Sequence, residues 1–116
     1  MTTASDATPL GGPTLPQERR LVTEIPGPES LARLERKKKY VSDGIGVGVP
    51  VFVTAAGGGV LIDADGNSLI DMGSGIAVTT VGNAAPEVAE RVADQVQRFT
   101  HTCFMVTPYE GYIAVA

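Results

Sequence analysis

The turn at residues 63–67, "DADGN", places the strongest constraint on the fold of this 116-residue chain, because apolar residues flank it on both sides. Residues 60–62 before it and 68–71 after it have the aliphatic content of short strands. Asp, Gly and Asn between two such runs are typical of a β-hairpin turn. A further strand is expected over 51–53, joined through "AAGGG", so the sequence predicts a small antiparallel sheet of three strands.

The same turn begins like a calcium-binding loop, with Asp63, Asp65 and Asn67 in the first, third and fifth positions. The sixth position would be Ser68, where such a loop requires glycine. The twelfth would be Ser74, where it requires a bidentate glutamate. We therefore interpret the segment as a hairpin turn and predict no metal site.

A long uncharged run follows the last predicted strand. Residues 71–83, "DMGSGIAVTTVGN", carry one charge, at Asp71. Gly73, Gly75 and Gly82 punctuate the run, and glycine lets a backbone approach a ligand or a neighbouring subunit closely. We expect a neighbouring part of the protein to shelter this run from water.

Residues 84–99, "AAPEVAERVADQVQRF", give the clearest helical pattern. Asn83 is expected to cap this helix, and Pro86 suits an early helical position. Apolar residues recur at spacings of four, four and three, and they predict one buried stripe: Val88, Val92, Val96 and Phe99.

A further helix is expected to open at Thr107-Pro108, after a short extended segment, and to run to Ala116. One face of it would be apolar: Tyr109, Tyr112, Ile113 and Ala116. No glycine cap and no basic last turn close this helix. We expect from this that the chain is the front part of a longer protein.

The first 28 residues hold five of the eight prolines, together with several threonines and glycines. Such a composition resists helix and strand alike, so residues 1–28 are predicted to form a mobile arm. Residues 29–41, "ESLARLERKKKYV", are predicted to follow as a helix. Pro28 and Glu29 suit its first turn, and Lys37 to Lys39 suit its C-terminal dipole.

Charge is spread unevenly, with seven basic and five acidic side chains in residues 1–39 but two basic and eight acidic in residues 40–116. The net charge of −4 argues against nucleic acid as the main partner. The basic residues of the predicted helix are interpreted as a solvated face: Arg33, Arg36, Lys37, Lys38 and Lys39. No window approaches 18 uncharged apolar residues and no secretory signal is found, so no membrane partner is expected and the cytoplasm is the default location.

Local chemistry supplies no complete catalytic set. Cys103 is the one cysteine, so no internal disulfide is possible, and His101, the one histidine, lacks the further ligands of a zinc site. A nucleophilic pair of Cys103 and His101 would need an orienting partner. We interpret Cys103 as a small buried thiol, and we assign no catalytic, cofactor-binding or metal-binding residue.

Several motifs together carry a family pattern. A D-x-x-G-x-x-x-[IL]-D motif spans residues 63–71, and an "SGIAV" loop, a G-x-x-x-P helix start and "HTCFMVTPYE" follow it. With these motifs, the chain from about Arg19 to Ala116 resembles the N-terminal part of the class III (subgroup II) pyridoxal-phosphate aminotransferases.

The resemblance implies an α/β fold, namely the N-terminal part of fold type I of the pyridoxal-phosphate-dependent transferases. Its elements would be an N-terminal helix, a small antiparallel sheet, a helix and the start of the next helix. Residues 29–116 would contribute to the small domain and to the lining of an active site at the interface of a homodimer. The chain would then be a fragment that stops before the domain holding pyridoxal 5′-phosphate.

The implied reaction is transamination with pyridoxal 5′-phosphate as the cofactor. The expected amino donor is 4-aminobutyrate, which would give succinate semialdehyde, and the expected acceptor is 2-oxoglutarate, which would give glutamate. Ornithine or another ω-amino acid stays open as the donor. A non-catalytic domain that pairs with itself or with a partner through its uncovered strands and helix face also stays open.

By the same resemblance, two residues are expected at the substrate. Ile76, in the "GIAV" loop, would contact the carbon chain of the substrate. Met105 would lie near the substrate, at a position where some relatives have glutamine, so no polar contact is carried over. The Gly-His pair that precedes the helix in the family is Gly82-Asn83 here, and the role of that histidine is not carried over.

The residues that hold the cofactor lie downstream in relatives: a phosphate-binding turn, an aspartate under the pyridine nitrogen and the Schiff-base lysine. None of them occurs in these 116 residues, and Lys37 to Lys39 do not match the catalytic lysine. We therefore expect the chain alone to be inactive.

Overall fold

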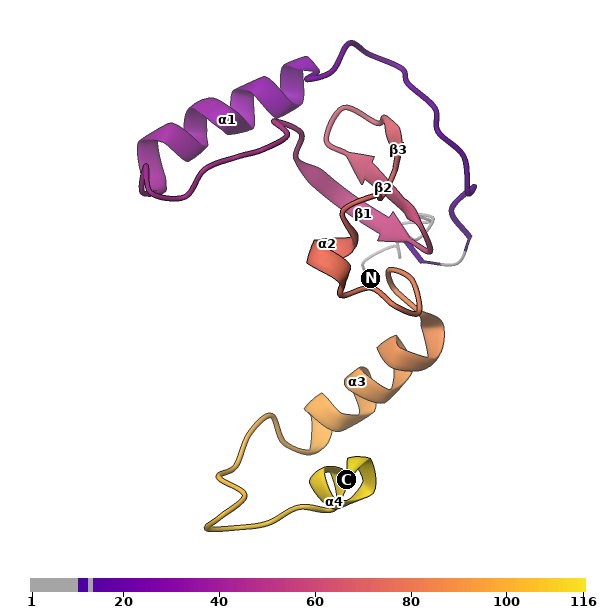
Figure 1. The fold of residues 1–116 in the computed structure, drawn as a ribbon, viewed down its shortest axis with the longest axis vertical. Coiled ribbons are helices and arrows are strands. Elements are labelled where there is room, and N and C mark those ends of the chain that lie inside the picture. Colours follow the sequence, from indigo (N-terminus) through magenta and orange to yellow (C-terminus); the bar gives the residue numbers. More distant parts are fainter. Residues whose placement is uncertain (1–10, 13) are drawn as a thin grey trace, which may run out of the picture. The chain divides into compact units, whose positions relative to one another are not determined.

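The computed structural model describes residues 11, 12 and 14–116, and the chain divides into two compact units, Met1–Ala85 and Pro86–Ala116. The described part has a small α/β architecture with one three-stranded sheet (Figure 1). Its elements follow in the order α1 (Pro28–Tyr40), β1 (Val53–Gly57), β2 (Val60–Asp63), β3 (Ser68–Ile70), α2 (Ser74–Ala77), α3 (Pro86–Arg98) and α4 (Glu110–Val115).

The sheet is antiparallel throughout, with β2 between β1 and β3. Val60 of β2 is opposite Gly57 of β1 and Ile70 of β3. The predicted hairpin around the turn at 63–67 is therefore confirmed. The first strand was placed wrongly at 51–53: it begins at Val53, contains a bulge between Val53 and Ala55, and ends at Gly57.

The N-terminal segment explains why alanine and glycine form a strand, although both have low strand propensity. Gly12 N–H donates to the Ala56 carbonyl at 2.9 Å. The Gln17 side chain donates to Gly57 O at 3.0 Å and accepts from Gly59 N–H at 2.9 Å. These hydrogen bonds hold the end of β1 in an extended conformation. The turn between β1 and β2 therefore consists of Gly58 and Gly59 only.

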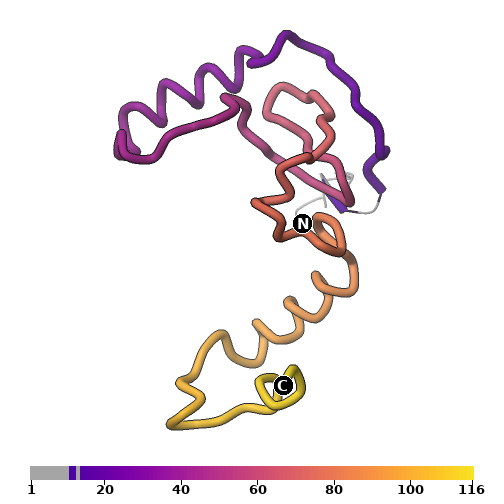
Figure 2. Tube along the Cα trace, in the orientation of Figure 1, coloured from indigo at the N-terminus to yellow at the C-terminus, as the bar shows by residue number. Residues whose placement is uncertain are grey.

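The same segment reaches the opposite edge of the sheet. Arg20 and Ser68 exchange two backbone hydrogen bonds, of 3.0 and 2.7 Å. Figure 2 traces this segment, in indigo, from residue 14 to the start of α1. Residues 1–10 and 13 of the predicted arm lie outside the described residues. The remainder of the arm contacts both edges of the sheet.

Helix α1 confirms the prediction for 29–41 to within one residue. Pro28 begins it, and Gly27 at the N-cap has no side chain to cap it. Asp65 supplies the cap from the hairpin turn: its two carboxylate oxygens accept from Glu29 N–H at 2.7 Å and from Ser30 N–H at 3.0 Å. The turn therefore fixes the start of the helix as well as the register of β2 and β3.

This cap predicts a pH-dependent helix start. Desolvation raises the pKa of Asp65, but hydrogen bonds from Ser30 and Glu29 and the charge of Arg33 outweigh it and hold that pKa below its ordinary value of 3.8. A depressed carboxyl pKa stabilises the fold above the ordinary value, and the contribution is lost as pH falls through the folded pKa. NMR shifts of the Glu29 and Ser30 amides should therefore titrate with a midpoint below 3.8. Asp65→Asn should abolish this titration, and a midpoint above 3.8 would contradict the cap.

Polar groups dominate the centre of the first unit. Val60 is 1% exposed and is the one buried hydrophobic side chain found in the described ranges. Three polar side chains are buried as well, those of Ser30, Asp63 and Asn67. Asp63 accepts from the backbone N–H groups of Asp65 and Asn67 at 2.9 and 2.8 Å. The oxygens that resembled calcium ligands are thus occupied by N–H donors.

In the second unit, α3 confirms the predicted helix, whereas α4 begins at Glu110 and not at Thr107. The Thr102 hydroxyl bonds with the carbonyl of Thr107 at 3.1 Å, and Thr107 N–H donates to Cys103 O at 2.9 Å. These bonds keep residues 102–107 in a turn and delay the helix. None of the helices in the described ranges combines the length and the apolar content that a membrane crossing requires.

Candidate functional site

The uncharged run forms a loop whose two ends meet at Asp71. One carboxylate oxygen of Asp71 accepts from Ser74 N–H at 2.7 Å, and the other accepts from the Asn83 side-chain amide at 3.1 Å. Asn83 also exchanges backbone hydrogen bonds of 2.9 and 2.8 Å with Gly58. The loop is therefore fastened to the glycine turn between β1 and β2.

The prediction that Asn83 caps α3 is wrong. Helix α3 begins at Pro86, and the Asn83 amide is directed to Asp71 and to the Gly58 carbonyl, at 3.4 Å for the latter. The sequence offers no local signal for this pairing, because its partners lie 12 and 25 positions away.

Within the loop, α2 is a left-handed turn. Ser74, Gly75, Ile76 and Ala77 have φ angles of 47°, 60°, 67° and 62°. Glycine adopts this conformation freely, but each of the other residue types is penalised by roughly 1–2 kcal/mol. A β-branched residue such as Ile76 is a genuine outlier there. The turn therefore stores strain that its hydrogen bonds must offset.

Ile76, the first predicted substrate residue, lies in this turn and is 94% exposed. Other apolar side chains of the loop are exposed with it: Met72, Val78 and Val81. A contact of Ile76 with substrate stays a prediction.

Met105, the second predicted substrate residue, belongs to the second compact unit, whereas Ile76 belongs to the first. It is 92% exposed and lies in the turn between α3 and α4. A role for Met105 at the substrate stays a prediction as well.

An aromatic cluster that was not predicted includes Phe104, the sequence neighbour of Met105. Phe104 contacts Tyr109 and Tyr112, with ring centroids 5.5 and 4.4 Å apart, and Tyr109 also meets Phe99 at 5.7 Å. These rings join the end of α3 to the start of α4. The sequence contains a signal for this cluster, because four of its six phenylalanines and tyrosines lie within fourteen residues.

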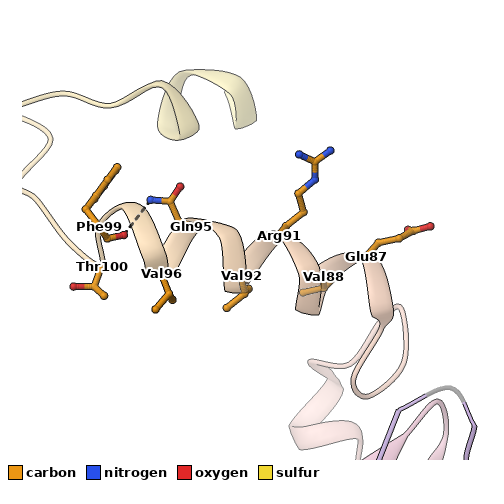
Figure 3. A pocket seen from close by; sticks show the side chains of 8 residues that line it. All are labelled: Glu87, Val88, Arg91, Val92, Gln95, Val96, Phe99 and Thr100. Carbon is orange, nitrogen blue, oxygen red and sulfur yellow. Dashed lines mark hydrogen bonds between the residues drawn. The ribbon is translucent and has the colours of Figure 1, made fainter.

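The apolar stripe on α3 is present as predicted, but the prediction that it is buried is not met within this chain. Figure 3 shows Val88, Val92 and Val96 pointing to one side of the helix. All three are exposed, and they line a groove of about 490 Å³ together with Phe99. The groove is mostly apolar, and Glu87, Arg91 and Gln95 also line it.

The interpretation of Cys103 as a buried thiol is wrong, because this cysteine is exposed. His101, two residues away, is exposed too. Across the part of the chain that the structure describes, no three His, Cys, Asp or Glu side chains gather in a way that could hold a metal ion.

The lysines test whether this chain could hold pyridoxal phosphate. Lys37 donates to the Ile45 carbonyl, and Lys38 forms an ion pair with Glu35 at 2.6 Å on the exposed side of α1. Lys39 stacks over the Tyr40 ring, 5.2 Å from its centroid. These are the three lysines of the sequence, and all lie in the last turn of one surface helix. The residues present therefore do not fit the cofactor.

Comparison with known proteins finds similarity to aminotransferases. Residues 43–116 match the family model described as "Aminotransferase class-III". The chain is 65% identical over 103 residues to a protein from Mycobacterium tuberculosis named 4-aminobutyrate aminotransferase, with 89% of this chain and 23% of that protein covered. It is 62% identical over 99 residues to the protein of that name from Mycobacterium leprae, with 85% and 22% covered.

A more distant relative has another name. The chain is 39% identical over 80 residues to a Pseudomonas putida protein named 5-aminovalerate aminotransferase, with 69% of this chain and 19% of that protein covered. The chain thus spans about a fifth to a quarter of the length of these relatives.

Proposed function

Since the chain belongs to the class-III aminotransferase family, we propose that it is the N-terminal portion of a 4-aminobutyrate:2-oxoglutarate aminotransferase. The observation that carries this proposal is the 65% identity over 103 residues to a protein named 4-aminobutyrate aminotransferase. The 39% identity to a protein named for 5-aminovalerate is much lower, so 4-aminobutyrate is the favoured donor. The products would be succinate semialdehyde and glutamate.

In this proposal the complete enzyme has fold type I, uses pyridoxal 5′-phosphate, and is a cytoplasmic homodimer. The cofactor would supply the electron sink for transfer of the amino group. The described residues would contribute the small domain and part of the substrate-pocket wall. The exposed valines of α3 support this role, because a helix stripe of this kind normally packs against another part of a protein.

The geometry of the loop supports the proposed role of Ile76. Ile76 stands out from the left-handed turn with nearly its whole side chain accessible, which suits an apolar wall against the methylene chain of the donor. Met105 is proposed as another apolar substrate contact. Neither side chain can move a proton, so both would bind and orient the substrate only.

The test is a coupled assay of the enzyme encoded by the full gene, loaded with pyridoxal phosphate. Turnover of 4-aminobutyrate with 2-oxoglutarate, with formation of succinate semialdehyde and glutamate, is the expected result. The competing donors are ornithine and 5-aminovalerate. A higher kcat/KM for either of them would replace the proposed donor, and the absence of transamination with all three would remove the proposed activity.

A substitution tests the proposed role of Ile76. Ile76→Ala removes three carbon atoms, each contributing up to about 0.8 kcal/mol where it is buried against substrate. Because the contact is partial, we expect kcat/KM for 4-aminobutyrate to fall about tenfold. Val81→Ala is the matched control, since Val81 is an exposed aliphatic residue of the same loop. Equal losses in the two variants would argue against a specific contact at Ile76.

A further inference from the structure

Asp71 holds the loop closed at two points. Its carboxylate accepts hydrogen bonds from the backbone N–H of Ser74 and from the side-chain amide of Asn83. Ser74 begins the left-handed turn, and Asn83 ends the loop. Hydrogen bonds to an ionised acceptor are roughly twice as strong as those between neutral groups. A single half-buried side chain therefore bonds to both ends of the loop at residues 71–83.

The residues of this clamp are themselves bonded to the turn between β1 and β2. Asp71 N–H donates to Gly59 O at 2.9 Å, so both Asp71 and Asn83 are tied to the glycine turn between β1 and β2. Gly82 has a φ of +88°, and a Cβ there would meet the Gly58 Cα at 3.1 Å. This close approach fixes the end of the loop against the sheet.

The turn inside the clamp needs such support. Ile76 N–H donates to Gly73 O at 2.8 Å and Val78 N–H donates to Ser74 O at 2.7 Å, and these bonds close a left-handed turn of mostly non-glycine residues. Without the bond from Asp71 to Ser74, the turn would relax toward the ordinary backbone region. Ile76 would then leave its present position.

We infer that Asp71 and Asn83 are positioning residues for the donor substrate: their clamp holds the left-handed turn so that Ile76 is fixed at the substrate's methylene chain. This inference rests on the proposed function. The position of Ile76 sets the room available along the chain, so the clamp favours 4-aminobutyrate over 5-aminovalerate, which is one methylene longer. Asp71 and Asn83 act through Ile76 and touch no reacting atom.

The experiment uses the complete enzyme loaded with pyridoxal phosphate. Asp71→Asn replaces the carboxylate acceptor of Ser74 N–H with a neutral amide oxygen, which is a weaker acceptor, and it turns an amide donor toward the amide donor of Asn83. We expect the ratio of kcat/KM for 4-aminobutyrate to that for 5-aminovalerate to fall about fivefold, because one methylene in an apolar pocket is discriminated by roughly 10- to 200-fold. Hydrogen exchange of residues 74–82 should rise in the same variant.

A double variant supplies the rescue. In Asp71→Asn with Asn83→Asp the donor and the acceptor trade places, so the pair forms again. The selectivity ratio and the slow exchange of the loop should largely return. Asp94→Asn is the matched control: it removes a carboxylate from an exposed ion pair with Arg98 on α3 and should change neither measurement. A merely structural role would lower both kcat/KM values together and leave their ratio unchanged.

Each outcome has a separate meaning. Unchanged exchange and an unchanged ratio in Asp71→Asn would overturn the clamp. Faster exchange with an unchanged ratio would overturn its role in donor selectivity. Wild-type enzyme that turns over neither donor would contradict the proposed function, and the exchange comparison would then decide the clamp by itself.

Discussion

Replacing Asn67 by alanine is expected to destabilise the first unit by about 3 kcal/mol. The Asn67 side chain is fully buried, and its oxygen accepts from the N–H groups of Val22 and Thr23 at 2.8 and 3.0 Å. Its amide donates to the Thr23 hydroxyl at 2.9 Å and to Asp63 at 2.8 Å. Each bond contributes about 1 kcal/mol net, and the buried Asp63 would also lose one donor.

Hydrogen exchange of the β2 amides measures this effect. The opening equilibrium should rise roughly a hundredfold, because about 1.4 kcal/mol corresponds to a factor of ten. Thr23→Val removes one of the four bonds and should give about a quarter of the free-energy change. Gln95→Ala removes an exposed amide and should shift the stability of β2 by less than about 0.5 kcal/mol. Unchanged exchange of β2 in Asn67→Ala would show that the network does not stabilise the sheet.

Replacing Gly27 by alanine is expected to cost about 2 kcal/mol, the usual penalty for adding an atom to a filled site. A Cβ at this position would lie 2.4 Å from Asp65 Cγ and 2.7 Å from Thr23 Oγ1. The backbone itself would accept alanine, with φ −81° and ψ 174°. The added methyl group would therefore push Asp65 away from the N–H groups that it caps at the start of α1.

The measurement for Gly27→Ala is hydrogen exchange along α1, which should accelerate by roughly 30-fold at its first turn. Gly46→Ala is the control, because a Cβ at Gly46 would meet nothing within 4 Å. If both variants behaved alike, the expected contact between residue 27 and Asp65 would be wrong.

Short-range patterns in the sequence predicted the elements whose signals are local. The turn at 63–67 and the repeat of valines on α3 each identify one element, and both elements appear where expected. The first strand was misplaced because its alanines and glycine are held by Gly12 and Gln17, which lie about 40 residues earlier. Tertiary contacts of this kind leave no mark on local propensity.

The candidate site was located only in outline. The loop at 71–83 was identified by its glycines and its lack of charge. Three non-glycine residues of its turn have positive φ, namely Ser74, Ile76 and Ala77, and their residue types do not predict that conformation. The clamp at Asp71 joins residues 3 and 12 positions away. Pairings of this kind follow from the folded loop and not from spacing.

The bonds from Asn67 to Val22 and Thr23 also impose an order on folding, because they span 45 and 44 residues. The hairpin of β2 and β3 closes across a few residues and can form early, whereas long-range contacts form late. At about 5–20 residues per second, a ribosome needs roughly 2–9 seconds to make the chain between these partners. The segment synthesised first must therefore wait, undocked, for the asparagine that anchors it.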